Sequence, residues 1–516
     1  MGIDVAVWFY RGLELQRTAD AAALAGVTRM PKIAAAEIAA KDIAEKNRID
    51  PSLVTVQRVP NSPRELEVTI TDPRVPSFFG RMIKKDLAIK RSAKAEFVAA
   101  VDLGSQVNAV GTGSFPGYGP GGVAQNFWLA INGFCTPKEY GDRYAAAYDA
   151  NITAIGSRCD SGNPVENTEY SGDYYATGRP SYTYIVDIPC PVLGQEPCVT
   201  PRTTAMHVAV YNPYFDKSDT GLDANVADNA TFDFVQVTTT FAVVDETGAP
   251  IAGPFDFGTC DALSCPGINN WVGLADIPAS AGAGRFRVEV STQADEANSY
   301  GANVFSLVAY PSSQGLGPCL AGPTVCPAVS GEKSMSVYAN VSGGQTDFFL
   351  AKLAPARYYR GKKIQILLSD IDQGASGVQI LAPGGIPTEF TYRTWDPGIK
   401  DSGSQVLDPA IARTVTLAPL HRVDVSTMLA AAPAAQLPPW PIASRKGQQL
   451  FNGRTLALEL NVPTTYGCVV ASSPCVEAPL VDDGWWKIRY TTAVGTVSDR
   501  TTWTVQLVGD PVHLRH

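Results

Sequence analysis

The chain has 516 residues, enough for several domains, and 45% of them are hydrophobic, which favours packed cores over wholesale disorder. Only 18% are charged, the formal net charge is −9, and 46 glycines and 38 prolines make the chain rich in turns. The acidic balance argues against non-specific nucleic-acid binding, and four histidines leave little material for histidine-based catalysis. Composition therefore favours short strands and points away from enzymes.

The first hundred residues mix helical and alternating patterns. Residues 3–27 predict a long helix, with Gly26 as a weak stop and Pro31 as a firmer one. Residues 31–47 predict a second, amphipathic helix. The patterns that follow are alternating runs at 53–59 and 66–71, a short helical piece at 77–84 and a strand-like run at 87–101. We expect residues 1–101 to form a long helix and a small α/β unit ordered α-β-β-α-β.

A glycine-rich linker at 102–125 separates this unit from a β-rich remainder. Strands are expected at 127–131, 182–188, 206–211, 232–243, 286–290, 303–310, 336–341, 348–353, 364–368, 378–381, 456–462, 486–490 and 503–507. The run Arg285–Val290 has one apolar and one charged face, which fits a sheet with one solvated face. With a Gly/Pro/Cys linker at 312–331, we predict an α+β chain with two antiparallel β-sandwich (jelly-roll-like) domains, 126–311 and 332–516. A single larger sandwich with insertions is the alternative.

Cysteine spacing indicates short disulfides. The ten cysteines are Cys135, Cys159, Cys190, Cys198, Cys260, Cys265, Cys319, Cys326, Cys468 and Cys475. Four couples lie 5 to 8 residues apart around Gly, Pro or Ser: 190 with 198, 260 with 265, 319 with 326, and 468 with 475. An oxidised pair can close such a loop, so we predict sequential disulfides in an extracytoplasmic compartment, with reduced, partly buried cysteines as the alternative.

The sequence offers weak candidates for metal and no catalytic motif. Asp216, Asp219 and Asp223 cluster beside Gly221 and suit a structural calcium ion, although Ala227 stands where an EF-hand needs Glu. A solvated acidic loop is the alternative. His207 lies in an alternating run, where neighbours normally satisfy a strand histidine. We therefore expect no enzyme and no cofactor beyond that calcium.

Tyrosines crowd one region of the chain. They are Tyr140, Tyr144, Tyr148, Tyr170, Tyr174, Tyr175, Tyr182 and Tyr184, eight of the chain's 20. Such a group could stack sugars or dock a protein partner. The alternative is packing within a sheet, which β-propensity favours.

Residues 3–26, IDVAVWFYRGLELQRTADAAALAG, resemble the start of the TadE/TadG-like proteins of Flp (tight-adherence) pilus assembly. In that family a membrane-spanning helix runs into a segment with an Asp, a Leu-Gln and an alanine-rich run ending in Gly. The matching residues are Asp4, Leu15, Gln16, Ala19, Asp20, Ala21, Ala22, Ala23, Leu24, Ala25 and Gly26. Residues 127–148 and 499–514 also resemble long TadG-type proteins with β-rich ectodomains.

The resemblance implies a non-enzymatic, membrane-anchored envelope protein with its bulk outside the cytoplasm and a role in pilus assembly or surface adherence. Its implied partners are pilin-like or pilus-assembly membrane proteins, with surface glycan as a further candidate. The von Willebrand A domain of many TadG proteins is not visible, so metal-dependent adhesion is not carried over. A secreted β-sandwich module that binds carbohydrate or protein is the competing hypothesis.

The predicted N-terminal helix bears on both the expected membrane anchor and the expected partner helices. No run of 18 apolar residues exists, but residues 1–10, MGIDVAVWFY, look like the last turns of a longer helix. We therefore expect a membrane span to precede residue 1. The small-residue face Ala19, Ala22, Ala23 and Gly26 permits close packing with pilin-like helices. Packing of that face on its own domain is the alternative.

Overall fold

A computed structural model of the chain divides into two compact units, Met1–Ala99 with Gly509–His516, and Ala100–Val508. The structure describes residues 2–29, 33–59, 65–75, 87–97, 101–105, 107–111, 127–133, 147–148, 181–191, 200–216, 237–245, 248–260, 270–294, 302–319, 325–332, 334–342, 345–369, 375–395, 415–417, 455–469, 475–492, 496–508 and 512–515. The α+β composition expected from the sequence is present: among these residues the two α-helices lie in the first unit and most strands in the second.

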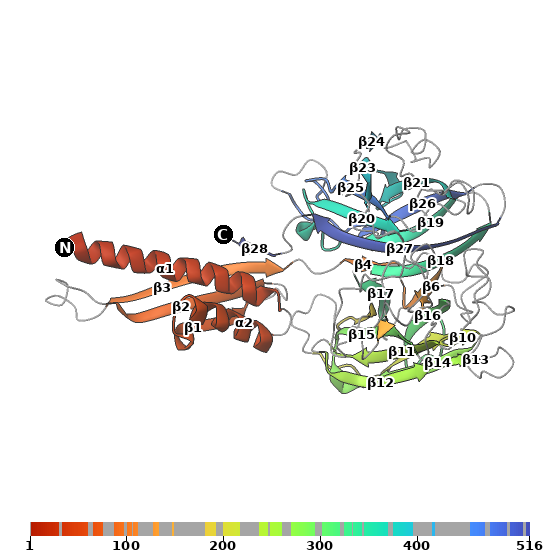
Figure 1. The fold of residues 1–516 in the computed structure, drawn as a ribbon, viewed down its shortest axis with the longest axis horizontal. Coiled ribbons are helices and arrows are strands. Elements are labelled where there is room, and N and C mark those ends of the chain that lie inside the picture. Colours follow the sequence, from red (N-terminus) through yellow and green to blue (C-terminus); the bar gives the residue numbers. More distant parts are fainter. Residues whose placement is uncertain are drawn as a thin grey trace, which may run out of the picture. The chain divides into compact units, whose positions relative to one another are not determined.

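The N-terminal unit packs two helices against a four-stranded antiparallel sheet (Figure 1). The helices are α1 (Gly2–Val27) and α2 (Ile33–Lys46), close to the predicted ranges. In sheet order the strands are β1 (Val54–Arg58), β2 (Glu65–Val75), β3 (Leu87–Phe97) and β28 (Val512–Arg515). The helical piece expected at 77–84 lies outside the described residues. The end of the chain, expected in the last β domain, instead adds β28 to this sheet beside β3.

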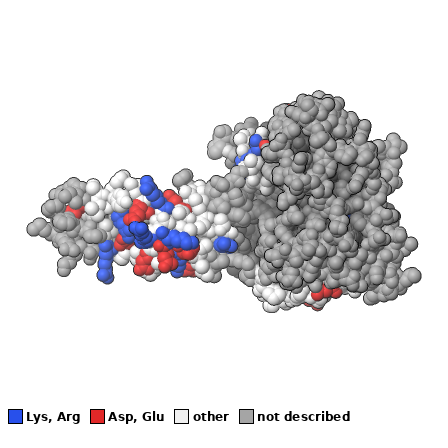
Figure 2. All heavy atoms as spheres, in the orientation of Figure 1, with Lys and Arg blue, Asp and Glu red and all other residues white. Residues whose placement is uncertain are grey.

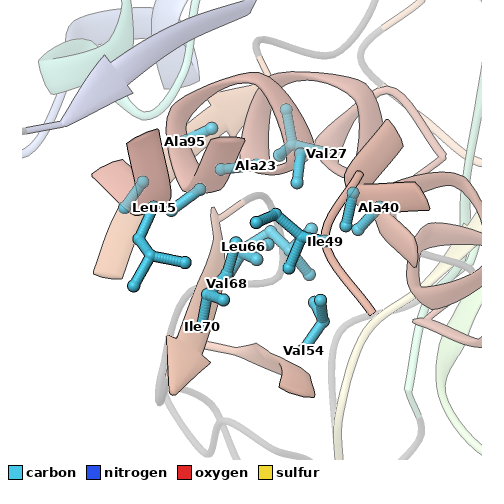
Figure 3. Packing of buried hydrophobic residues seen from close by; sticks show 14 of the residues in the cluster. Leu15, Ala23, Val27, Ala40, Ile49, Val54, Leu66, Val68, Ile70 and Ala95 are labelled. Carbon is cyan, nitrogen blue, oxygen red and sulfur yellow. The ribbon is translucent and has the colours of Figure 1, made fainter. Parts of the chain in front are cut away.

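One buried cluster joins the helices and the sheet of this unit (Figure 3). Leu66, Val68 and Ile70 alternate along β2 and all three are fully buried. They meet Leu15 and Ala23 of α1 in the same cluster as Ala40 of α2. Because strand side chains alternate between faces, both helices cover one face of the sheet.

Two large sheets form the unit 100–508, and their strands run antiparallel except for the short β7. In order, the first sheet contains β12 (Pro250–Phe257), β11 (Val237–Val244), β15 (Gly284–Ala294), β8 (Tyr182–Ile188), β17 (Ala328–Glu332), β4 (Asp102–Leu103), β19 (Gln345–Lys352), β26 (Trp485–Thr492), β21 (Ala375–Ala382) and β22 (Ile386–Pro387), with β7 (Ala147–Tyr148) beside β15. The second contains β14 (Trp271–Ile277), β9 (Met206–Tyr211), β16 (Ala302–Pro311), β6 (Phe127–Asn132), β18 (Ser334–Ser342), β27 (Thr496–Val508), β20 (Lys363–Ser369), β25 (Thr455–Asn461), β23 (Phe390–Trp395) and β24 (Val415–Leu417), with β5 (Ala109–Val110) beside β16. A separate pair joins β10 (Phe215–Asp216) to β13 (Thr259–Cys260).

Aromatic side chains from the two sheets meet in the core. The ring of Phe305 in the second sheet lies 5.5 Å from that of Phe241 in the first. Farther along the same sheets, Trp503 lies 5.7 Å from Phe348. Tilted and edge-on contacts of this kind add to the free energy gained from burying the rings.

Both sheets continue across the segments expected to be linkers. Residues 102–125 contribute β4 and β5, and β17 begins within 312–331 and joins β8 to β4. Each sheet takes strands from both sides of 312–331, so residues 126–311 and 332–508 belong to one compact unit.

The charged face of β15 is only partly solvated, less than expected for Arg285–Val290. Glu289 is only 3% exposed. Arg287 donates to Glu332 over 3.1 Å, and Arg285, whose side chain is 29% exposed, is paired with Asp102. Strand pairing brings β17 and β4 alongside β8, so ion pairs cover part of this face.

Candidate functional site

The residues of the family motif lie along α1 and mostly face the interior of their own unit. Leu15, Ala19, Ala22 and Ala23 are fully buried, and Asp4 is 3% exposed.

The polar motif residues hold the helix in place. The amide nitrogen of Gln16 donates to Asp20 over 2.8 Å and to the backbone carbonyl of Ser92 on β3 over 3.1 Å. Ala21 and Leu24 are half-buried, and Leu24 packs against the core. The motif therefore fastens α1 to the sheet.

Gly26 lies inside α1, one residue before its end, and serves packing rather than helix termination. A Cβ atom there would lie 2.6 Å from Cδ2 of Leu66 and 3.0 Å from the carbonyl oxygen of Ala36. The small-residue face Ala19, Ala22, Ala23 and Gly26 is thus occupied by the chain's own α2 and β2. Packing on its own domain, the alternative reading of this face, is what the structure has.

The first half of α1 presents a different surface, the α1 apolar face, made of Val5, Phe9, Tyr10 and Leu13. Their exposed fractions are 59%, 68%, 73% and 42%. Val5, Phe9 and Leu13 recur every four residues and so share one side of the helix. Exposed apolar residues grouped in this way mark a surface that contacts a partner or a membrane.

Charged residues of both signs cover other parts of this unit. On the side shown in Figure 2, Lys and Arg are interspersed with Asp and Glu. Arg11, next to Tyr10, is held by Glu14 at 2.8 Å and by Asp72 at 2.7 Å, and these partners raise its pKa against the effect of burial. Across the described residues, no helix combines the length and the apolar composition needed to cross a bilayer.

Two of the predicted cysteine couples are disulfides in the structure. Cys319 pairs with Cys326 and Cys468 with Cys475, with Cα atoms 5.5 Å and 5.3 Å apart. Cys190 is also disulfide-bonded, and Cys260 lies on β13. The remaining cysteines, Cys135, Cys159, Cys198 and Cys265, lie outside the described residues.

Of the three calcium candidates, only Asp216 lies in the described part of the chain. Asp216 ends β10, whereas Asp219 and Asp223 lie outside the described residues. Over the residues described, no three His, Cys, Asp or Glu side chains gather in a way that could hold a metal ion.

The tyrosine-rich region divides between core and undescribed chain. Tyr182 and Tyr184 of β8 are buried, and the ring of Tyr184 packs 5.9 Å from that of Phe305. These two rings therefore pack the core and cannot stack a ligand, so the binding hypothesis is wrong for them. Tyr148 lies on β7, and Tyr140, Tyr144, Tyr170, Tyr174 and Tyr175 lie outside the described residues.

His207 is satisfied by a neighbouring strand, as expected for a strand histidine. Its Nδ1 atom is paired with the carboxylate of Asp276 on β14, and its ring lies 5.3 Å from that of Tyr310 on β16. The pKa of Tyr310 is raised by burial and by the charge of Asp276. His421 and His516 lie outside the described residues, and His513 of β28 is paired with Glu96 of β3.

A row of aromatic rings runs across the same face of these strands. Tyr211 lies 5.3 Å from Trp271 of β14 and 5.8 Å from Trp128 of β6. Neither tryptophan stands out in the sequence patterns. The alternating pattern of the sequence shows that His207 and Tyr211 share one face of β9. The positions of Trp271 and Asp276 beside them depend on strand pairing, which the pattern does not show.

Comparison of the chain with models of known protein families and with curated proteins finds no match to either.

Proposed function

We propose that this chain is the extracytoplasmic part of a TadG-like cell-envelope protein, non-enzymatic, which contributes to Flp pilus assembly or surface adherence. The α1 apolar face carries the proposal. It would meet an apolar partner helix of the pilus-assembly membrane proteins, while the rest of α1 is fixed to its own sheet. Because the other side of α1 is packed on its own sheet, the helix is a rigid support for the apolar surface on its first half.

The contrast between the two halves of α1 supports this role. Phe9 and Tyr10 are 68% and 73% exposed, whereas Ala22 and Ala23 are fully buried. Leaving large apolar side chains in water forgoes about 1.5–3 kcal/mol for each that could be buried. A binding partner would recover that free energy.

The β-rich unit suits the exterior of a cell. The disulfides Cys319–Cys326 and Cys468–Cys475 are of the kind that persists in oxidising compartments. We further propose that the two sheets pack face to face as β-sandwiches, in keeping with the ring contacts Phe241–Phe305 and Phe348–Trp503.

Complementation in the producing bacterium tests the proposal. The gene is deleted and replaced with the wild type, with Phe9→Asp/Leu13→Asp, or with Ile38→Asp, a matched control on α2 at a residue that is 71% exposed. Membrane association of the protein is measured by fractionation, and surface pili by electron microscopy. Wild type and Ile38→Asp should restore both, whereas the double variant should stay with the membrane and fail to restore pili. Normal pili and membrane association with the double variant would refute the role given to the α1 apolar face.

A secreted binding module is the second candidate. The ring row Trp271–Tyr211–Trp128 favours it, because Trp271 and Trp128 are half-buried on a sheet face, with the buried ring of Tyr211 between them, and such rings are suited to stacking a ligand.

A further inference from the structure

A group of aromatic and polar side chains lies on the face of the second sheet that points away from the first. We call it the β14 aromatic face: Trp271 and Asp276 of β14, His207 and Tyr211 of β9, and Tyr310 of β16. Pairing puts Asp276, His207 and Tyr310 side by side, and Trp271 beside Tyr211. The opposite face is the core, because Leu307, paired with Val210, alternates with these positions and is fully buried.

We propose that the β14 aromatic face binds a neutral carbohydrate, with a pyranose ring stacked on Trp271 beside Gly273 and its hydroxyls hydrogen bonded to Asp276 and His207. This site goes beyond the pilus role and does not rest on it.

The open space at Gly273 gives the ligand room. Gly273 lies between Trp271 and Asp276 on the edge strand β14 and is exposed. A Cβ atom built there would have nothing within 4 Å. Its partner on β9, Ala209, is 4% exposed and belongs to a small buried cluster with Ala109 and Val308, against which Trp271 and Tyr310 pack. The open space therefore lies at Gly273 on the edge of the sheet, beside the Trp271 ring. Tyr211 and His207 are four residues apart on β9, about 13 Å, which suits a short oligosaccharide.

The aromatic rings supply the stacking surface. Trp271 is half-buried and is supported from below by Tyr211, whose ring centroid lies 5.3 Å away. Because the contact with Tyr211 already restricts the rotamers of Trp271, stacking a ligand on this ring costs little further side-chain conformational entropy.

Asp276 and His207 supply the directional contacts. The Asp276 side chain is 70% exposed, and its Oδ1 atom is paired with Nδ1 of His207. Within the described part of the chain, neither Oδ2 of Asp276 nor Nε2 of His207 has a hydrogen-bond partner. These atoms can bond to sugar hydroxyls, which both donate and accept.

The charge of the site selects among ligands. The proposed site contains the carboxylate of Asp276, and the whole chain has a net charge of −9. These negative charges would repel sugars bearing carboxylate or sulfate, so the expected ligand is a neutral glycan. Burial and the charge of Asp276 raise the pKa of Tyr310, and its hydroxyl adds a donor beside the same pair.

Binding of the full chain to defined neutral oligosaccharides tests the proposal. The probes are hexamers of β1,4-linked glucose, β1,4-linked N-acetylglucosamine and galactose, with a polygalacturonate oligomer as the acidic comparison, measured by titration calorimetry. We expect at least one neutral probe to bind and the acidic one not to bind. Trp271→Ala should weaken that binding by about tenfold or more.

Two further variants separate loss of the site from loss of the fold. Gly273→Val puts a side chain into open space on a strand, so the fold should be kept while the ligand is blocked. Phe255→Ala removes an aromatic residue that is 36% exposed on β12 of the other sheet and should leave binding unchanged.

Three results would overturn the glycan site: no probe bound by the wild type, binding unaffected by Trp271→Ala and Gly273→Val, or preference for the acidic probe. Should Gly273→Val abolish adherence of cells while no probe binds, this face docks a protein and the glycan proposal is wrong. Membrane association and pili, which test the α1 apolar face, should be unaffected by Trp271→Ala, so the two proposals can fail separately.

Discussion

The side-chain oxygen of Asn108 accepts a hydrogen bond from the backbone amide of Cys319, 3.2 Å away, although the two residues are 211 positions apart. The amide nitrogen of Asn108 donates to the carbonyls of Ala309 at 2.8 Å and Gly317 at 3.1 Å. Asn108 is 3% exposed, so one buried side chain joins the disulfide loop at Cys319 to β16.

Asn108→Ala should therefore lower the free energy of unfolding by about 2–4 kcal/mol, because it leaves buried backbone groups without partners. Urea unfolding of the full chain measures the change. Ser313→Ala, at an exposed position in the same segment, should shift it by less than about 0.5 kcal/mol. Equal stability of the two variants would contradict the role of Asn108.

Gly26→Val should destabilise the N-terminal unit by about 1–3 kcal/mol, the range for overpacking a core. The new side chain would be forced against Leu66 and the carbonyl of Ala36. Thermal unfolding followed by helical circular dichroism measures the loss. The control Arg17→Val puts the same β-branched residue on an exposed position of α1 and should cost only its lower helix propensity. A Gly26→Val protein as stable as this control would show that α1 and α2 have room to separate.

The ion pair between Arg285 and Asp102 should contribute measurably to the β-rich unit. Burial opposes the charge on Arg285, but Asp102 outweighs it and raises the pKa of the guanidinium. Asp102→Asn should cost about 2 kcal/mol, less than a fully buried pair, because the Arg285 side chain is still 29% exposed.

A double-mutant cycle with Arg285→Met isolates that coupling. The same cycle on Lys46 and Asp42, an exposed pair 2.6 Å apart on α2, should give no more than about 0.5 kcal/mol. Coupling energies of the same size for the two pairs would mean that burial adds nothing to Arg285–Asp102.

Tyr466 should make the stability of the β-rich unit sensitive to alkali. Burial raises its pKa to about 12. Because the folded state favours the protonated phenol, its contribution is fully present below the ordinary pKa of about 10 and is lost as the pH rises through about 12. Unfolding free energies across this range, with tyrosinate absorbance, measure the effect. Tyr466→Phe should reduce the decline relative to the wild type, and an unchanged slope would refute the assignment.

Local patterns determined much of the secondary structure from the sequence alone. The alternating run at 206–211 is β9, and the helical pattern at 3–27 is α1, because side-chain periodicity is a property of neighbouring residues. The couples 319 with 326 and 468 with 475 were visible for the same reason, since a short loop keeps its ends close. The strand β12, PIAGPFDF, was missed because it is mostly exposed and contains Pro and Gly, so it shows no apolar alternation.

Only the tertiary structure decided which elements meet. The chain end joins β3 through β28, the small face of α1 is covered by α2 and β2, and the register of β14 with β9 brings Asp276 to His207. Each depends on contacts between residues far apart in the chain, whose free energy is set by packing and hydrogen bonding across the fold. The sequence alone therefore determined the helices and most strands, while strand pairing and burial decided which side chains were left to contact a partner.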